Sequence, residues 1–513
     1  MHSKAKRLTS KHTASKMFCD LRLHTFRELT MIIPATAQRR NETRLGRIEA
    51  ASLRRCAVAG VFLLCVLLTA TPLPAQTPAQ PEREQLLNGL RLMFWLQPSS
   101  QEVTVKLRIN SGAAFDLAGK SGQMALLGDL LFPDPATVDF FTDEMGGKLD
   151  VNVGYDSTTI TMVGKAHEFE QIIEVLRNAI LSTQLTPEVI TRMRDQRIKL
   201  LRDTSIVPAA VADRAVLARL FGDFPYGRPS AGSPEDVARV ERADLMQARD
   251  RFLNSNNATL AIIGGVTKPR AMRAVRQLLG PWRKSEQIIP TTFRQPAPAD
   301  PRTLIVNIAG PTVELRLAAR GVARSDADFA TAEVLARLAQ NRWQALSPEL
   351  TKQPVFARND AFVLPGAFVM GAAVNEMTVA DSLANARKAL DSLMKTPATA
   401  EELERAKTEV IKELTPVITK PEAFADPWLD ADTYRLSAAQ DQIALLRAVT
   451  APEVQRVANR LFNKTIVSVV AGETASLKAA LQGRYQYEVL GEIATPAPSP
   501  KPPGKPAGNV NPR

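Results

Sequence analysis

Histidine and cysteine, the side chains that most often hold a catalytic metal, are scarce in this chain and lie almost entirely near its N-terminus. The full set is His2, His12, His24, His167, Cys19, Cys56 and Cys65. Only His167 lies beyond residue 75, and a zinc site built on imidazole or thiolate needs several such donors close together. Residues 76–513 therefore cannot supply a metal cluster of this type, and they cannot form a disulfide.

His167 stands in the run G-K-A-H-E-F-E-Q, between a predicted strand and a predicted helix. One hypothesis makes it a metal ligand together with Glu168 or Glu170, or with Asp129 and a distant glutamate. The alternative is a residue at a helix start, where carboxylates of the first turn are stabilised by the helix dipole. We favour the alternative, because no second imidazole follows residue 75.

The excess positive charge of the chain is concentrated in its first 75 residues. They hold 13 Lys and Arg against 4 Asp and Glu, whereas the remaining residues have a net charge of only +3. A nucleic-acid-binding face would need clustered basic residues in the folded part. We therefore expect no nucleic-acid partner.

Residues 1–75 have the layout of an export leader. Arg54 and Arg55 precede the uncharged run 57–70, and the small residues Pro74 and Ala75 follow. The run is too short to span a bilayer comfortably, so we expect cleavage near Ala75, with no stable membrane span in the mature chain. The prediction is an exported, periplasmic or otherwise extracytoplasmic protein, with Met31 as an alternative translation start. The competing hypothesis is an uncleaved signal that anchors the chain in the inner membrane.

The run Gly119–Phe132, G-K-S-G-Q-M-A-L-L-G-D-L-L-F, organises the rest of the chain. It follows the alternating run Val103–Ile109, whose period of two predicts a half-buried strand, and its apolar residues then take helical spacing. The sequence therefore predicts a strand, a glycine-rich turn and a buried helix over residues 122–132.

This stretch resembles the zinc helix of the pitrilysin/insulinase family of zinc peptidases, which carries H-x-x-E-H after a G-K-T-G turn. On that frame the first His falls on Ala125, the Glu on Gly128 and the second His on Asp129. Two later runs resemble the family in the same order, namely F-G-D-F-P-Y-G-R-P at 221–229 and N-N-A-T-L-A-I-I-G-G at 256–265. The resemblance implies a peptidase scaffold whose zinc helix has lost its ligands.

The same family takes its third zinc ligand from a glutamate on a later helix. Counting back from Pro208, as the resemblance implies, places this position near Leu200 in the run R-I-K-L-L-R, where no carboxylate occurs. We therefore expect no bound zinc and no peptidase activity from this chain alone. Zinc is expected only in an active partner subunit.

An internal duplication predicts two lobes. Residues 243–252 and the strand after them are echoed by residues 452–462 and their strand, and T-P-E at 186–188 is echoed by T-A-E at 399–401. Such a repeat, about 210 residues apart, is what two tandem copies of one fold leave in a sequence. Mixed strands and helices indicate an α+β fold. The resemblance implies two homologous lobes, each an antiparallel-rich sheet packed with helices, that face each other across a cavity.

The predicted boundaries follow from composition. They are a leader over 1–75 with its apolar core at 57–70, an N-terminal lobe over 76–283, a proline-rich linker over 284–301, a C-terminal lobe over 302–493 and a proline-rich, disordered tail over 494–513.

Peptide binding is the activity that would survive the loss of the metal ligands. Strands at 148–153 and 158–163 form a predicted hairpin, and the first of them resembles the strand on which the family pairs its substrate. The peptide-binding candidates are Leu149, Asp150, Val151, Asn152 and Arg342. Arg342 lies in a segment that resembles the family's substrate-holding Arg and Tyr, whose own positions fall on Ser347 and Phe356. The alternative for Arg342 is a surface arginine whose stem packs on Trp343.

Three functions stay open at this point. The first is a non-catalytic subunit that pairs with an active insulinase-family peptidase and helps to form a chamber for unfolded peptides or small proteins. The second is an active zinc metalloendopeptidase with an atypical site. The third is a stand-alone peptide-binding scaffold that adds an extended peptide to an exposed strand.

Overall fold

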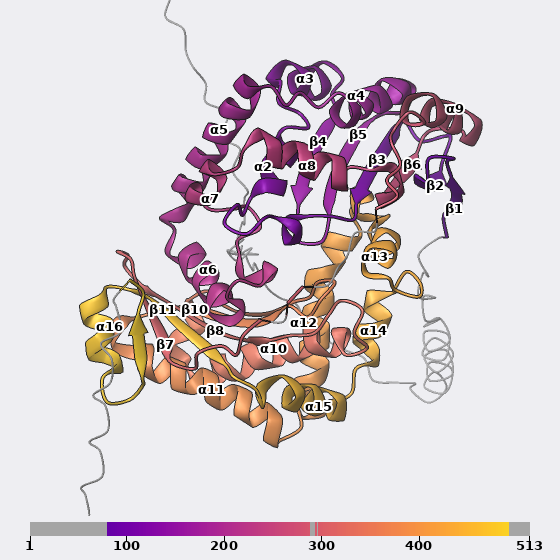
Figure 1. Cartoon of the computed structure of the whole chain (residues 1–513). Helices are drawn as coiled ribbons and strands as arrows, with labels where there is room; N and C mark the ends of the chain where they lie inside the picture. Colours follow the sequence, from indigo (N-terminus) through magenta and orange to yellow (C-terminus); the bar gives the residue numbers. More distant parts are fainter. Residues whose placement is uncertain (1–79, 288–292, 295, 492–513) are drawn as a thin grey trace, which may run out of the picture. The chain divides into compact units, whose positions relative to one another are not determined.

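The computed structural model describes residues 80–287, 293–294 and 296–491 (Figure 1). The predicted leader over 1–75 and the predicted tail over 494–513 lie outside the described residues. Within the described part, no helix is both long enough and apolar enough to cross a membrane. This part folds around two six-stranded sheets, one ending at Gly264 and the other starting at Thr303.

The first sheet has the strand order β1-β2-β6-β3-β5-β4. Its strands are β1 (Glu82–Gln85), β2 (Arg91–Leu96), β3 (Glu102–Ile109), β4 (Lys148–Val153), β5 (Thr158–Lys165) and β6 (Ala258–Gly264). Only β2 and β6 pair in parallel, and the other neighbours are antiparallel. The strand β4 is therefore an edge, and the predicted hairpin of β4 and β5 is present.

The second sheet repeats this arrangement. Its order is β12-β7-β11-β8-β10-β9, with the strands β7 (Thr303–Asn307), β8 (Val313–Arg320), β9 (Val355–Asp360), β10 (Ala367–Val374), β11 (Val467–Gly472) and β12 (Tyr487–Val489). The parallel pair β7–β11 matches β2–β6, and the edge strand β9 matches β4. The two sheets differ at one edge, because β12 pairs in parallel with β7 whereas β1 is antiparallel to β2. The shared order and directions of the other five strands of each sheet confirm the predicted α+β fold with two homologous lobes.

Helices surround both sheets. Those before residue 300 are α2 (Gln123–Asp129), α3 (Pro135–Asp139), α4 (Phe169–Leu181), α5 (Pro187–Ser205), α6 (Pro208–Phe221), α7 (Pro234–Ala238), α8 (Arg242–Phe252) and α9 (Lys268–Leu279). Those after it are α10 (Phe329–Leu346), α11 (Val379–Lys395), α12 (Ala400–Ile418), α13 (Asp426–Tyr434), α14 (Gln442–Ala448), α15 (Ala451–Phe462) and α16 (Thr474–Leu481).

Local signals set several helix ends. Thr186 accepts a hydrogen bond from the Val189 N–H at the start of α5, and Thr399 forms a capping box with Glu402 at the start of α12. These are the two threonines of the sequence repeat. The predicted helix over 122–132 is shorter in the structure, because α2 ends at Asp129.

Each sheet buries one face under helices of its own lobe. In the first lobe, side chains of β3 such as Leu107 and Ile109 pack in one apolar cluster with residues of α2, α4, α8 and α9. In the second lobe, Leu315 and Leu317 of β8 pack with residues of α10, α11 and α15, including the fully buried Trp343. Burial of this apolar surface is the main force that holds each lobe together.

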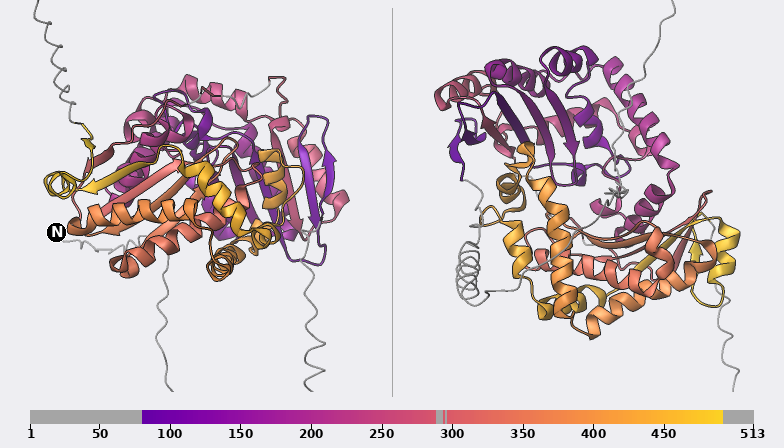
Figure 2. Two further views of the ribbon diagram at one scale, coloured as in Figure 1. Left: turned by 90° about the horizontal axis from the view of Figure 1, so that it is seen from below. Right: turned by 180° about the vertical axis from the view of Figure 1, so that it is seen from behind.

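The other face of each sheet is covered by a helix from the opposite half of the chain. Val216 and Leu220 of α6 pack on Leu304 and Val469 of the second sheet. Leu429 of α13 packs on the first sheet, and Figures 1 and 2 show this orange helix against the purple strands. The two halves therefore exchange one helix each, which ties their sheets together.

Buried ion pairs anchor both exchanged helices. Arg108 of β3 donates to Asp430 of α13 at 2.6 Å, and Lys106 donates to Asp426 at 2.7 Å. On the other side, Arg316 of β8 donates to Asp213 of α6 at 2.6 Å. Since β3 and β8 are equivalent strands, the same type of contact recurs in both halves.

Candidate functional site

The face of α2 that would carry two zinc ligands instead contacts a cation. Ala125 and Asp129 lie four residues apart and so on one side of the helix. Arg197 of α5 meets both positions: its Nε and Nη2 donate to the Asp129 carboxylate at 2.5 and 2.7 Å, and Nη2 also donates to the Ala125 carbonyl oxygen at 3.2 Å. A bidentate pair of this kind is strong and directional. The guanidinium of Arg197 is thus fixed in front of α2.

Gly128 stands at the position of the family's glutamate, and Val153 occupies the space that a side chain there would need. Gly128 lies on α2 where β4 crosses it, and a Cβ built on Gly128 would stand only 2.7 Å from Val153 Cγ2 of β4. A glutamate could not occupy this position without a shift of Val153. The absence of a side chain at 128 therefore allows β4 to pack closely on α2.

The structure corrects the predicted third-ligand position. Leu200 is 59% exposed, and the residue of α5 that faces Ala125 and Asp129 is Arg197, nearly one turn earlier. The sequence count missed Arg197, although an acidic residue at 129 signals the need for a basic partner. Predicting which residue of α5 faces Ala125 and Asp129 would have required knowing how α5 crosses α2.

These residues do not fit a zinc ion. Ala125 and Gly128 offer no ligand atom, and the Asp129 carboxylate is engaged by the guanidinium of Arg197, which repels a metal cation. Within the described ranges, no group of three or more His, Cys, Asp or Glu side chains is arranged to hold a metal ion.

His167 is not brought to this site. Its ring is 75% exposed at the end of β5 and lies 3.6 Å from Glu168. Glu170 instead pairs with Arg270 of α9, whose guanidinium also donates to the His167 carbonyl oxygen. The structure therefore places His167 at a helix start, apart from the Asp129–Arg197 pair.

A buried carboxyl caps α2 from outside the helix. Asp116 accepts the backbone N–H groups of Gly122 and Met124 at 2.7 and 2.8 Å. Gly122 has φ +89°, and a Cβ there would stand 2.8 Å from the Ala231 carbonyl oxygen, so glycine is required at this turn. Burial raises the pKa of Asp116 from 3.8 to about 7.

We predict that the protein loses stability as the pH rises from about 4 to about 7. Folding raises the pKa of Asp116, so the folded chain holds the proton more tightly, and this stabilisation disappears as Asp116 ionises. The loss is on the order of 2–3 kcal/mol between about pH 5 and about pH 8. Urea unfolding at the two pH values measures it. The difference in the free energy of unfolding between the two pH values should be smaller in Asp116→Asn. An unchanged difference would exclude Asp116 as its source.

The peptide-binding candidates on β4 lie on an open edge. Asp150 and Asn152 are exposed, whereas Leu149 and Val151 are half-buried and pack against the apolar cluster of the first lobe. Edge strands present backbone N–H and C=O groups that an extended peptide can pair with. The first lobe thus offers a strand for such pairing beside the degenerate α2.

Arg342 is placed differently from both hypotheses. It lies on α10, and its guanidinium donates to Glu402 of α12 at 3.1 and 3.2 Å and to Ser392 of α11 at 3.0 Å. The side chain is only 14% exposed. Arg342 therefore joins helices within the second lobe, and the structure supports neither a substrate contact nor a free surface arginine.

The hairpin turn after β4 is fixed to the second lobe. Asp156 accepts a hydrogen bond from the Tyr226 hydroxyl at 3.1 Å and another from the Val363 N–H at 2.8 Å. The Tyr226 hydroxyl in turn accepts from the Leu364 N–H at 3.1 Å. These bonds position the β4 edge relative to the second sheet.

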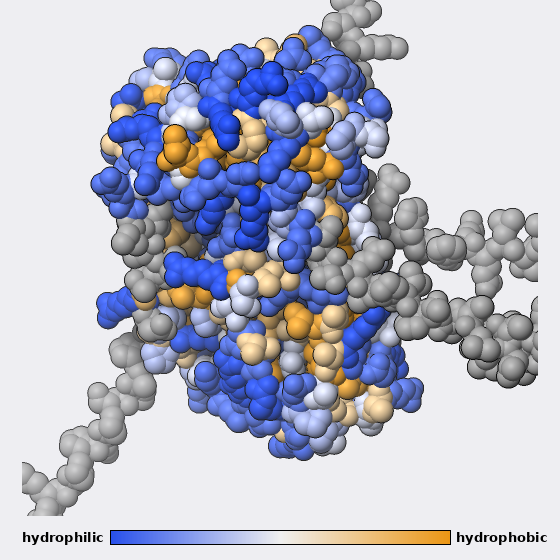
Figure 3. All heavy atoms as spheres, turned by 90° about the vertical axis from the view of Figure 1, so that its right-hand side faces the viewer, coloured by the Kyte–Doolittle hydropathy of each residue, from blue (hydrophilic) through white to orange (hydrophobic). Residues whose placement is uncertain are grey.

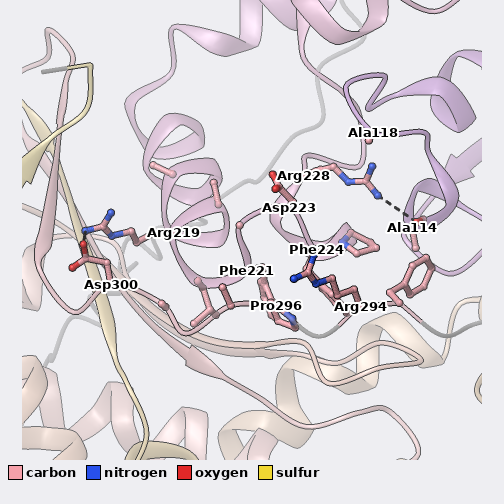
Figure 4. Close-up of a pocket in the computed structure, with 18 of the residues that line it drawn as sticks. Ala114, Ala118, Arg219, Phe221, Asp223, Phe224, Arg228, Arg294, Pro296 and Asp300 are labelled. Atoms are coloured by element: carbon pink, nitrogen blue, oxygen red, sulfur yellow. Dashed lines mark hydrogen bonds and ion pairs between the residues drawn. The ribbon is translucent and has the colours of Figure 1, made fainter. Parts of the chain in front are cut away.

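A cavity of about 1050 Å³ lies where α6, the loop after it and the described part of the linker meet (Figure 4). Phe293 of the linker packs on Phe115 and Phe224, with ring centroids 5.7 and 6.1 Å away. Figure 4 shows Arg219 beside Asp300 at one end and Arg228 directed toward Ala114 at the other. The cavity thus combines aromatic walls with fixed arginines.

Comparison with known proteins agrees with this architecture. Residues 239–410 match the family model described as the peptidase M16 inactive domain. An uncharacterized zinc protease of Mycobacterium bovis is 24% identical over 219 residues, which is 40% of this chain and 50% of that protein. Subunit 1 of the human mitochondrial cytochrome b-c1 complex is 24% identical over 211 residues, or 40% of this chain and 44% of that protein. The chain thus spans about half the length of the curated relatives that it matches.

Solved structures share the fold over a larger part of the chain. A protease from Helicobacter pylori superposes with a TM-score of 0.70 at 16% identity, over 77% of this chain and 100% of that one. A peptidase M16 inactive domain from Pseudomonas fluorescens gives 0.68 at 17% identity, over 77% and 98%.

Proposed function

We propose that this chain, which matches the peptidase M16 inactive domain over residues 239–410, acts as a non-catalytic partner subunit that helps an active M16 peptidase to form a peptide-binding chamber. The observation that carries the proposal is the pair of Asp129 and Arg197, which occupies the place of the zinc ligands. The fold around this pair is kept, and so is an open β4 edge. A scaffold with an altered metal site and an intact edge suits peptide binding better than hydrolysis.

The substrates of such a chamber would be unfolded peptides or small proteins. A peptide could pair with β4, and its side chains could reach the aromatic cavity beside α6. We further propose that the mature chain works in the periplasm, or in another extracytoplasmic compartment, after cleavage near Ala75. The support for this part is the charge and apolar pattern of residues 54–75.

The test mixes the purified mature chain with an M16 protein from the same genome that carries an intact H-x-x-E-H. The proposal predicts co-elution in size-exclusion chromatography and faster, chelator-sensitive hydrolysis of an unfolded peptide than the active subunit achieves alone. This chain alone should not hydrolyse the peptide. Chelator-sensitive hydrolysis by this chain alone would favour the atypical metallopeptidase. Peptide binding with no co-elution would favour a stand-alone scaffold.

A substitution on the exposed face of β4 tests the peptide edge. We predict that Asp150→Lys weakens the binding of a basic, unfolded peptide about fivefold, because it reverses a charge beside the added strand. Fluorescence anisotropy of a labelled peptide measures the effect. The matched control is Glu174→Lys, an exposed charge reversal on α4 that should leave peptide affinity unchanged. Equal loss in both variants would argue against pairing at β4.

A further inference from the structure

A second cavity, of about 450 Å³, lies within the C-terminal lobe and shares no residue with α2 or β4. One wall is apolar and is formed by Val410, Leu414 and Val417 of α12 together with Leu445 and Leu446 of α14. Val417 and Leu445 remain 55% and 40% exposed at its mouth. Figure 3 shows apolar side chains on the lower part of this side of the molecule.

The lining also includes a carboxyl group, that of Glu333, which forms no ion pair within the described part of the chain. Glu333 of α10 accepts a hydrogen bond from Asn359 Nδ2 of β9 at 3.1 Å, and no ion pair joins it to a Lys or Arg among the described residues. Asn359 is 8% exposed, and its Oδ1 is buried without a hydrogen-bond partner in the described structure. The pair of Glu333 and Asn359 therefore has spare acceptor capacity and lacks donors.

Burial of this carboxyl has an electrostatic cost. Desolvation raises the pKa of Glu333 from 4.5 to about 7. A cation brought to Glu333 would offset that cost by stabilising the ionised form.

The other charged groups near the cavity already have partners. Arg324 donates to Gln440 at 2.8 Å, lies 3.8 Å from Asp430 and stacks on the Phe329 ring at 4.0 Å. Glu413 of α12 is paired with Arg337. Asp360 is paired with Arg358 at 3.1 Å. Arg324 lowers the pKa of Glu333 through its charge, but by less than burial raises it. Glu333 is therefore a lining carboxylate with no ion-pair partner among the described residues.

We propose that this cavity binds a primary alkylammonium group, with the ammonium on Glu333 and Asn359 and the alkyl stem along the apolar wall. An ammonium group supplies three donors and one positive charge, which are what this pair of side chains lacks. Val410, Leu414 and Val417 remove the stem from water. The ligand is either a free amine or a lysine side chain of a peptide. The proposal does not depend on the function proposed for the first lobe.

Ligand-observed NMR on the mature chain tests the site with n-pentylamine, Nα-acetyl-lysine amide, pentanoate and 1-pentanol. We expect saturable binding of the two amines and none of pentanoate or 1-pentanol. Tighter binding of the lysine derivative would identify a peptide as the source, and tighter binding of pentylamine would identify a free amine. Saturable pentanoate binding, or no binding of either amine, would overturn the proposal.

Two variants locate the binding. Glu333→Gln removes the charge but keeps the shape and should weaken amine binding at least about tenfold. Val417→Lys adds a positive charge at the mouth of the cavity, at an exposed position, and should weaken it about fivefold. The matched control, Glu401→Gln, changes an exposed glutamate in the first turn of α12 and should have no effect. Unchanged amine affinity in Glu333→Gln would place the binding elsewhere and refute the site.

Discussion

Zinc is expected to bind the triple variant Ala125→His/Asp129→His/Arg197→Glu at least about 100-fold more tightly than the double variant Ala125→His/Asp129→His. In the double variant two imidazoles share one face of α2, but Arg197 remains against that face as a fixed positive charge. Replacing Arg197 with glutamate removes the repulsion and supplies a third, anionic ligand from α5. Competition with a colorimetric zinc chelator measures both affinities.

The control for this experiment is Ala125→His/Asp129→His/Leu200→Glu. Leu200 is exposed and does not face α2, so its replacement should not improve zinc affinity. Equal gains from Leu200→Glu and Arg197→Glu would contradict the placement of Arg197. Gly128 is left unchanged because any side chain there meets Val153.

The variant Arg108→Ala is expected to lower the free energy of unfolding by about 3 kcal/mol. Arg108 is 11% exposed and pairs with Asp430 at 2.6 Å and Asp426 at 3.3 Å, so its loss leaves two carboxylates of α13 with less compensation. Because α13 packs on the first sheet, faster hydrogen exchange over 426–434 should accompany the loss. Urea unfolding and hydrogen-exchange mass spectrometry measure the two effects.

An exposed arginine pair provides the comparison. Arg249 and Asp250 are 31% and 57% exposed, and Arg249→Ala should change stability by less than about 0.5 kcal/mol. If Arg108→Ala behaved like Arg249→Ala, or if exchange over α13 were unchanged, then these ion pairs would not hold α13 on the sheet.

Local patterns predicted much of the fold. The alternating run at 103–109 forms β3, the hairpin of β4 and β5 is present, and Thr186 and Thr399 cap equivalent helices. The prediction that this strand is half-buried was wrong, because α13 also covers its polar face and buries Lys106. Each of these features depends on residues close together in the sequence, where spacing and capping chemistry decide the structure. The repeat of such signals also predicted the duplicated topology.

The missed features depend on contacts between distant segments. Arg197 reaches Asp129 across 68 positions, so its role follows from how α5 crosses α2. The apolar pattern of α6 or α13 also cannot tell which sheet the helix covers, because any buried face looks alike in sequence. The partners of Arg342 also could not be predicted, because Glu402 and Ser392 lie on other helices.

The most direct measurement is the zinc content of the purified chain after equilibration with micromolar zinc and removal of free metal. With Arg197 bound to Asp129 and no ligand atom at Ala125 or Gly128, mass spectrometry of the native protein should find the metal-free chain, with no peptide hydrolysis. Stoichiometric, tightly held zinc together with chelator-sensitive hydrolysis would contradict the proposal that this chain is a non-catalytic subunit.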